Sequence, residues 1–176
     1  MVHKMCKKQK IFGIVGWQNS GKTTLITALI KHMKQLGLSV STVKQTHHDF
    51  EIDHEGKDSY EHRHAGATEV IIASQHRWAI IHENTDDTKS VDIDMLLEKM
   101  EAVDIVLIEG VKQGRHPKIS VHRPENKKAV LKDEAKNIVA FACPHPLQTG
   151  YEYNHPTLNL NNPSEVVDFI LSYEGI

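Results

Sequence analysis

The chain has 176 residues, of which 39% are hydrophobic and 25% are charged, a composition typical of a soluble globular protein with one core. Its formal net charge of −2, from 21 basic and 23 acidic residues, excludes a general electrostatic attraction to nucleic acid or membranes. We therefore expect neither among its partners. The two cysteines, Cys6 and Cys143, do not suggest a disulfide framework, so a reducing, cytoplasmic setting is expected.

The amino-terminal part of the chain predicts a strand, a glycine-rich loop and a helix. Residues 1–9 are polar and expected to be frayed, and no apolar run is long enough for a signal peptide or a membrane span. The apolar run 10–15 predicts a buried strand. Residues 24–36 carry apolar side chains at helical spacing, and Gly37 follows where a helix C-cap glycine is typical. Between strand and helix, residues 16–23 read GWQNSGKT, the G-x-x-x-x-G-K-T pattern of phosphate-binding loops.

This pattern predicts a site for a purine nucleoside triphosphate with Mg²⁺. A tight loop before a helix aims several backbone N–H groups at the negative charge of a polyphosphate. Gly16 and Gly21 supply the backbone freedom that the loop needs. The ammonium group of Lys22 reaches the β- and γ-phosphates, and the Thr23 hydroxyl ligates Mg²⁺. Trp17, inside the loop, either lines a pocket or packs on the next element.

The segment after the first helix predicts a second strand whose carboxyl end lies at the ligand-binding edge of the sheet. Residues 38–44 alternate apolar and polar side chains, which indicates a second strand joined by a parallel crossover. Residues 45–57 follow as a polar, acidic stretch, and open α/β sheets bind ligands beyond the carboxyl ends of their strands. Three acids lie in or directly after this stretch: Asp49, Asp53 and Asp58. One of them is a candidate to position an attacking water or to help hold Mg²⁺. The alternative is that they are solvated loop acids without such a role.

A hairpin is predicted next. Residues 58–65 indicate a helix that ends at Gly66. The runs 69–74 and 77–82 read as strands separated by two residues, which is long enough only for a tight antiparallel hairpin. The pattern therefore predicts a mixed sheet.

The second informative stretch lies at residues 104–110, after a predicted amphipathic helix at 91–100. Four apolar residues end in Glu109 and a glycine, which resembles a Walker B strand that delivers an acid to the phosphate loop to hold Mg²⁺. An ordinary buried strand with a terminal acid is the alternative. Lys44 and Lys112 are candidates to neutralise phosphates, or are surface lysines.

The remaining elements complete an α/β fold. They are a short strand at 118–122, a charged loop or helical turn at 124–135, a buried strand at 137–142, a last short strand at 158–160 and a closing helix at 164–171 after Pro163. Together the elements predict a single nucleotide-binding domain over residues 1–176 with a P-loop NTPase fold. We expect three layers, with a mostly parallel or mixed sheet and helices on both faces.

Two further patterns raise the question of a metal. Histidines cluster at His47, His48, His54, His62 and His64, where a solvated active-site loop is favoured over a transition-metal site. The triplet at residues 143–145 (Cys-Pro-His) resembles the nickel-binding triplet of urease-accessory GTPases, with a buried thiol as the alternative. The Asn-Lys-x-Asp box of guanine-specific proteins is absent, because residues 126–129 lack its aspartate.

Several stretches together resemble the molybdopterin-guanine dinucleotide biosynthesis adaptor family (MobB). The resemblance covers about the first two-thirds of the chain in the correct order. Its specificity lies in the His-Asp-Phe and Gly-Lys-Asp-Ser stretches more than in the phosphate loop, which many families share. The matching segments are residues 16–25, 43–50, 56–60 with 65–67, and 108–112 with 117–119.

The resemblance implies a homodimeric, cytoplasmic GTP-binding protein of the signal-recognition-particle and MinD-like class, with weak GTPase activity. Such a protein assists the guanylyltransferase that attaches GMP to molybdopterin, and molybdopterin itself is a further candidate ligand. Asp49 would lie in a switch-like region, and with Lys22 it forms the candidate catalytic pair; Thr23 and Glu109 would hold Mg²⁺. The implied nucleotide-binding residues are Gly16, Gln18, Asn19, Ser20, Gly21, Lys22, Thr23 and Thr24.

Two other functions fit parts of the pattern. A nickel-delivery GTPase would use the histidines and the Cys-Pro-His triplet. A small-molecule kinase would need an acceptor pocket and an arginine-rich lid, and Arg63, Arg77, Arg115 and Arg123 are scattered along the chain.

Overall fold

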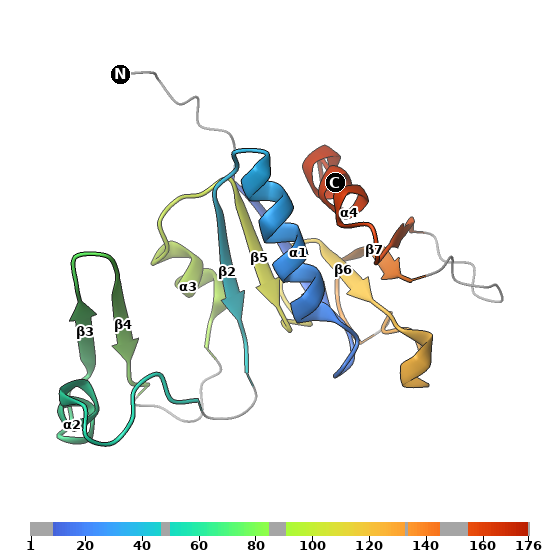
Figure 1. Cartoon of the computed structure of the whole chain (residues 1–176). Coiled ribbons are helices and arrows are strands. Elements are labelled where there is room, and N and C mark those ends of the chain that lie inside the picture. Colours follow the sequence, from blue (N-terminus) through green and yellow to red (C-terminus); the bar gives the residue numbers. More distant parts are fainter. Residues whose placement is uncertain (1–8, 47–49, 85–90, 133, 145–154, 176) are drawn as a thin grey trace, which may run out of the picture. The chain divides into compact units, whose positions relative to one another are not determined.

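A computed structural model describes residues 9–46, 50–84, 91–132, 134–144 and 155–175 (Figure 1). The chain divides into two compact units, one of residues 1–45 with 100–176 and one of residues 46–99. The first unit carries a six-stranded sheet, and the second carries a two-stranded hairpin. The expectation of one nucleotide-binding domain over the whole chain stays a prediction.

The large sheet is parallel between every pair of neighbouring strands. Its order is β2-β5-β1-β6-β7-β8, so the first strand of the chain lies inside the sheet between β5 and β6. This order confirms the predicted α/β fold with a mostly parallel sheet. The strands are β1 (Lys10–Val15), β2 (Val40–Lys44), β5 (Ile105–Glu109), β6 (Lys118–Val121), β7 (Ile138–Cys143) and β8 (Thr157–Asn159).

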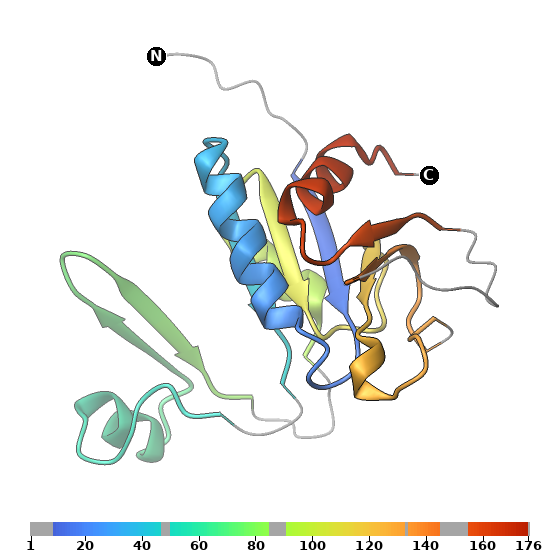
Figure 2. The ribbon, with the colours of Figure 1, turned by 45° about the vertical axis from the view of Figure 1, so that its right-hand side comes forward.

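Two helices cover one face of this sheet, α1 (Lys22–Gln35) and α4 (Pro163–Ser172), and they pack against each other (Figures 1 and 2). Their apolar side chains form one core with alternate residues of the strands, including the fully buried Phe12, Leu29 and Ile170. Each such side chain contributes about 1.5–3 kcal/mol through burial. The helices therefore fix the sheet whose edge carries the phosphate loop.

The opposite face of the sheet is covered by the connection between β6 and β7. This connection begins with a single 3-10 turn, η1 (Pro124–Asn126), where the sequence predicts a charged loop or helical turn. Leu131 and Ala135 from the same connection are buried against Val15 of β1 and Phe141 of β7. The connection is thus part of the core, and it runs close to the loop that follows β1.

The ends of the helices follow local rules. Gly37 has a φ of 77°, and after α1 its N–H donates to the Lys34 carbonyl at 3.0 Å, while the Leu38 N–H donates to the Met33 carbonyl at 3.0 Å. These two bonds form a Schellman motif, which favours glycine at the left-handed position. Pro163 opens α4 as predicted, since a proline in the first turn has no N–H to leave unpaired. Within the described ranges, no helix has both the length and the apolar character needed to cross a bilayer.

The second unit consists of α2 (Asp58–His64), β3 (Glu69–Ala73), β4 (Trp78–His82) and α3 (Ile93–Glu98). Strands β3 and β4 form the predicted antiparallel hairpin, with Ile71 opposite Ile80. The expectation that this hairpin makes the main sheet mixed is wrong for the described residues, because β3 and β4 pair only with each other. Helix α2 packs on β3, where Val70 is buried, so the hairpin gains a local cover instead.

Candidate functional site

The phosphate loop joins the carboxyl end of β1 to the first turn of α1. Gly16 begins it in a place that admits no side chain, because a Cβ there would lie 2.5 Å from the Val121 carbonyl oxygen and 2.6 Å from Ser20 Oγ. Asn19 has a φ of 63° and Gly21 has a φ of 91°, so the chain turns through two left-handed residues before the helix. The sequence therefore folds into the tight bend that its glycines predict.

Among the described residues, the bend ends at the uncapped amino end of a helix. Gly21 is the N-cap of α1, its position makes no side-chain capping bond, and the first turn contains no acidic residue. The first N–H groups of a helix lack partners within the helix and carry partial positive charge. Ser20 is buried, and its Oγ has no hydrogen-bond partner among the described residues. A buried hydroxyl beside free N–H groups fits an anionic ligand.

Lys22 folds back over the loop. Its Nζ donates to the carbonyls of Gly16 at 3.1 Å and Trp17 at 3.0 Å. Burial lowers the pKa of Lys22 below its ordinary value; the nearby Glu109 carboxylate opposes this shift, and the ammonium groups of Lys44 and Lys112 add to it. Lys22 is thus affected by two other ammonium groups and one carboxylate, an excess of positive charge that suits a polyphosphate.

The predicted magnesium ligands meet in the structure. Thr23 Oγ1 donates to Glu109 Oε1 at 2.9 Å, from the first turn of α1 to the last residue of β5. The sheet produces this contact because β1 and β5 are parallel neighbours, with Ile14 opposite Glu109. A hydroxyl and a carboxylate are oxygen ligands of the type that Mg²⁺ prefers, so the donor set fits this ion. The remaining predicted loop residues, Gln18, Asn19 and Thr24, are exposed at the same bend.

Trp17 packs on the connection between β6 and β7, and the alternative that it lines a pocket stays a prediction. Its Nε1 donates to the Ala129 carbonyl at 2.7 Å, and its ring packs against the core cluster that contains Leu131. Lys112 Nζ lies 4.8 Å and Lys128 Nζ 5.6 Å from the ring centroid. These distances are typical of cation–π contacts. The indole therefore holds two cations beside the phosphate loop.

One residue near the loop escaped the sequence analysis. Arg123 follows β6 by two residues, and its guanidinium group lies against Gly21, since a Cβ on that glycine would be 2.9 Å from Arg123 Nε. In the sequence, Arg123 is one of several arginines scattered along the chain, with no pattern that indicates a role. The missing information was the strand order, which makes β6 the neighbour of β1 and so brings the ends of both strands to one edge.

The structure describes only some of the predicted acids between β2 and the hairpin. Asp49 lies outside the described residues, as do His47 and His48. Asp53 is buried and paired with Arg63 at 2.6 Å in the second unit, so its carboxylate is engaged in an ion pair. The pKa of Asp53 is lowered by this hydrogen bond to Arg63.

Arg63 is the centre of a network in the second unit. Besides Asp53 it pairs with Glu51 at 2.6 Å and with Glu83 at 2.5 Å. The network ties the segment before α2 and the end of β4 to α2. It gives Asp53 a structural role within this unit, and its predicted water-positioning or Mg²⁺-binding role stays a prediction.

No group of three or more histidine, cysteine or acidic side chains in the described part of the chain is arranged to hold a metal ion. Cys143 is buried at the end of β7, and burial raises the pKa of its thiol to about 11. His145, the last residue of the Cys-Pro-His triplet, lies outside the described residues. Asp58 is the first residue of α2, and His62 and His64 lie in the last turn of that helix.

Comparison with known proteins decides the family. The model of the family "Molybdopterin guanine dinucleotide synthesis protein B" (MobB) matches residues 11–144. The chain belongs to the MobB family. The match includes the phosphate loop, the strand that ends in Glu109 and the segment from Arg123 to Ala129.

Relatives and solved structures of the same family cover most of the chain. A molybdopterin-guanine dinucleotide biosynthesis adapter protein of Haemophilus influenzae is 38% identical over 162 residues, which cover 91% of this chain and 86% of the relative. The Escherichia coli K12 adapter protein is 34% identical over 171 residues, covering 93% and 92%. The crystal structure of Bacillus subtilis MobB aligns with a TM-score of 0.71 and 27% identity, over 93% of this chain and 96% of that one. A MobB homologue from Bacillus stearothermophilus aligns with a TM-score of 0.67 and 26% identity, over 92% and 94%.

Proposed function

We propose that this protein is a GTP-binding adapter of molybdopterin-guanine dinucleotide biosynthesis that acts in the cytoplasm and hydrolyses GTP slowly. The adapter role is supported by family membership and by the names of its relatives. Nucleotide binding is supported by the uncapped amino end of α1, the folded-back Lys22 and the contact between Thr23 and Glu109.

Each part of the site has a role in this proposal. The loop N–H groups and the Lys22 ammonium bind the β- and γ-phosphates and offset their negative charge. Thr23 and Glu109 would hold Mg²⁺, which supplies further positive charge to the phosphates when bound. Lys22 and Asp49 are the proposed catalytic residues: Lys22 stabilises charge on the transferred phosphoryl group, and Asp49 positions the attacking water.

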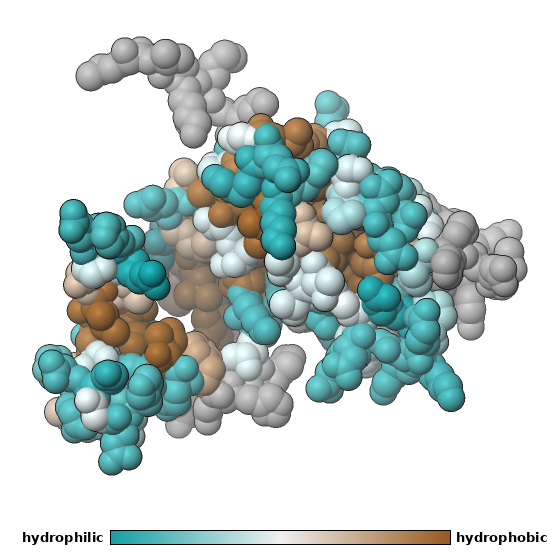
Figure 3. All heavy atoms as spheres, in the orientation of Figure 1, coloured by the Kyte–Doolittle hydropathy of each residue, from teal (hydrophilic) through white to brown (hydrophobic). Residues whose placement is uncertain are grey.

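The same proposal includes two protein partners. As an adapter, the protein binds the guanylyltransferase that attaches GMP to molybdopterin, with molybdopterin as a further ligand. It also binds a second copy of itself through one face of the β3–β4 hairpin. That face carries Ile71, Trp78 and Ile80, which are 64%, 64% and 45% exposed, and Figure 3 shows hydrophobic surface over the hairpin. Exposed apolar side chains of this size on a small hairpin favour a protein partner. Sedimentation should show a dimer that Ile80→Glu dissociates, and a monomer for the unchanged chain would refute this interface.

The nucleotide assignment is tested by competition between GTP and ATP for the purified protein, with and without Mg²⁺. We expect GTP to bind more tightly than ATP and Mg²⁺ to strengthen binding. Lys22→Ala should weaken GTP binding more than tenfold, because hydrogen bonds to charged groups contribute about 1.5–3 kcal/mol. Lys31→Ala, which removes an exposed lysine from the same helix, is the matched control. GTP affinity within twofold of the unchanged protein in Lys22→Ala would contradict the assignment.

A further inference from the structure

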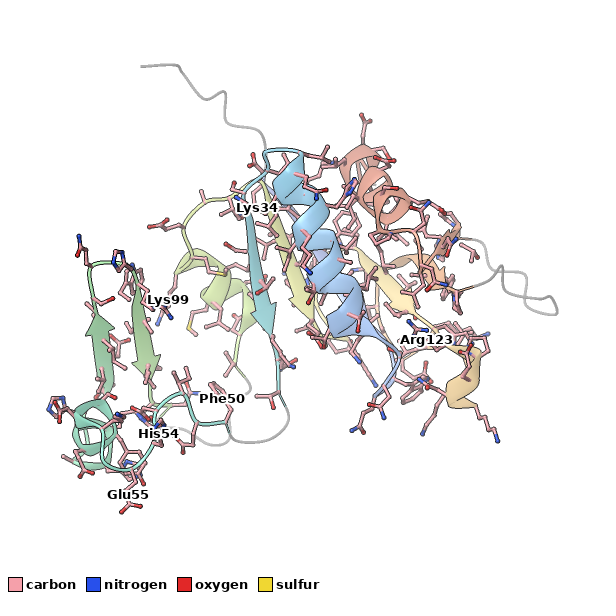
Figure 4. The ribbon with its side chains drawn as sticks, in the orientation of Figure 1. Lys34, Phe50, His54, Glu55, Lys99 and Arg123 are labelled. Atoms are coloured by element: carbon pink, nitrogen blue, oxygen red, sulfur yellow. The ribbon has the colours of Figure 1, made fainter. Side chains whose placement is uncertain are left out.

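The connection between β6 and β7 returns to the phosphate loop at several points. Val15 of β1 lies opposite Ser120 of β6, so both strands end at the same edge of the sheet. Arg123 leaves β6 at that edge, beside the amino-terminal end of α1 (Figure 4). Further along, the Ala129 carbonyl accepts the hydrogen bond from Trp17. The connection is therefore held next to the loop by contacts of its own.

The edge of the Arg123 guanidinium group that carries Nε and Nη2 faces the bare side of Gly21. A Cβ built on that glycine would be 2.9 Å from Nε, 3.3 Å from Nη2 and 3.6 Å from Cζ of Arg123. The absence of a side chain at Gly21 thus has a second effect besides permitting its backbone conformation. It lets a planar cation approach the main chain where the free N–H groups of α1 begin.

This arrangement is electrostatically unfavourable without a ligand. The amino end of a helix repels cations, and Arg123 is half-buried there, beside Gly21. Arg123 forms no ion pair with a carboxylate among the residues that the structure describes. The buried Ser20 hydroxyl in the same loop also lacks a described partner. An anion bound at this loop would offset the positive charge of Arg123 and offer a hydrogen-bond acceptor to the buried Ser20 hydroxyl.

We propose that Arg123 is a second phosphate-binding cation of this site, which contacts the polyphosphate of the bound nucleotide across the loop from Lys22. The inference rests on the proposed nucleotide-binding function. A guanidinium group suits the position because its fork of N–H donors pairs with two phosphate oxygens at once, whereas an ammonium group offers a point charge. Arg123 would thereby link occupancy of the loop to the β6–β7 connection.

The test is calorimetric titration with GTP and Mg²⁺, repeated with inorganic triphosphate as a probe that lacks the nucleoside. Arg123→Ala should weaken binding of both ligands about ten- to hundredfold, the range expected for a hydrogen-bonded charge pair. Arg123→Lys should lie between, because it keeps the charge and loses the fork. The matched control is Arg115→Ala, which removes an exposed arginine before the amino end of the same strand.

The outcomes separate this inference from the function on which it rests. If Arg123→Ala binds both ligands within twofold of the unchanged protein while Lys22→Ala loses them, the Arg123 assignment is wrong and the nucleotide site stands. A loss seen with GTP but not with triphosphate would also overturn it, because the contact would then involve the nucleoside. Failure of the unchanged protein to bind GTP would refute the proposed function and this inference together.

Two measurements distinguish phosphate binding by Arg123 from a purely structural role. Thermal unfolding of each variant without ligand reports folding, and Arg123→Lys replaces Arg123→Ala if the latter fails to fold. The dependence of affinity on salt concentration should become less steep in Arg123→Ala, because one cation fewer faces the phosphates. An unchanged salt dependence in a folded Arg123→Ala variant would refute the contact.

Discussion

Lys118 on β6 gives the sharpest test of the packing around the site. Its side chain is fully buried, and its Nζ donates to the carbonyls of Gly114 and His116, each at 3.0 Å. Burial lowers its pKa from 10.5 to about 8. Between these two pH values the unfolded chain binds more protons than the folded chain at this residue, so the free energy of unfolding rises with pH.

The expected size follows from these two pKa values. The rise approaches about 1.4 kcal/mol per pH unit, and integration from about pH 7 to about pH 9.5 gives about 2 kcal/mol. Lys118→Met lacks this titration, so the difference in unfolding free energy between unchanged protein and variant should rise by about that amount, in favour of the unchanged protein.

Urea unfolding followed by circular dichroism over this pH range measures the difference. Lys127→Met, which removes an exposed lysine, is the control for the loss of one charge. Only the change of the difference with pH matters, so the unpaired carbonyls that Lys118→Met leaves behind do not affect the result. A difference that stays flat would show that Lys118 titrates alike in the folded and unfolded chain, and the reasoning from burial would be wrong.

Three other predictions address the site and the second unit. Glu109→Gln should lower nucleotide affinity more in the presence of Mg²⁺ than in its absence, since it removes the carboxylate that contacts Thr23. An equal loss of affinity under both conditions, measured by calorimetry, would argue against Glu109 as a metal ligand. Cys143 should resist thiol reagents in the folded protein and react after denaturation, because its thiol is buried and has a raised pKa. The measurement uses a Cys6→Ser variant, in which Cys143 is the remaining cysteine. Arg63→Met should speed amide hydrogen exchange in α2 and the hairpin by leaving the buried Asp53 carboxylate unpaired, and unchanged exchange there would show that the network does not stabilise this unit.

The pH dependence at Asp53 has the same sign as that at Lys118, because both folded pKa values are depressed and the free energy of unfolding therefore rises with pH. Arg63 depresses the pKa of the folded Asp53 carboxyl, so this pair stabilises the second unit above the ordinary pKa of aspartate, near 3.8. The contribution is lost as the pH falls through the depressed value, when the folded carboxylate takes up its proton.

The elements with strong local patterns were predictable. The strand at residues 10–15 and the phosphate loop coincide with the structure, since an apolar run followed by a glycine loop and a helical period leaves few alternatives. The strand that ends in Glu109 was predicted for the same reason, and its contact with Thr23 followed from the Walker B interpretation. The helix predicted at 91–100 is shorter, at Ile93–Glu98, and its later start is explained by the Asp92 side chain, which caps it by accepting from the Asp94 N–H at 2.9 Å.

The features that depend on distant pairing were not predictable. Trp17 meets Ala129 across 112 positions of sequence, and the place of Arg123 beside Gly21 depends on β6 lying next to β1. The hairpin illustrates the same limit, since its two strands were recognised from their spacing but their separation from the main sheet was not. A local pattern specifies an element, whereas the neighbour of that element is decided by packing across the whole chain.

The position of residues 46–99 in the chain constrains how the protein can be shortened. The segment leaves from the carboxyl end of β2 and returns to the amino end of β5, its parallel neighbour, so it must run back along a strand about 17 Å long. Direct fusion of Gln45 to Met100 would leave six residues between β2 and β5, fewer than the dozen or so that a crossover between parallel strands needs. Joining Thr68 to Glu83 is different, because the N–H of Glu83 already donates to the Thr68 carbonyl at 3.0 Å. Trimming at that bond removes both strands of the hairpin and keeps the return path, which makes it the cut that the sheet tolerates.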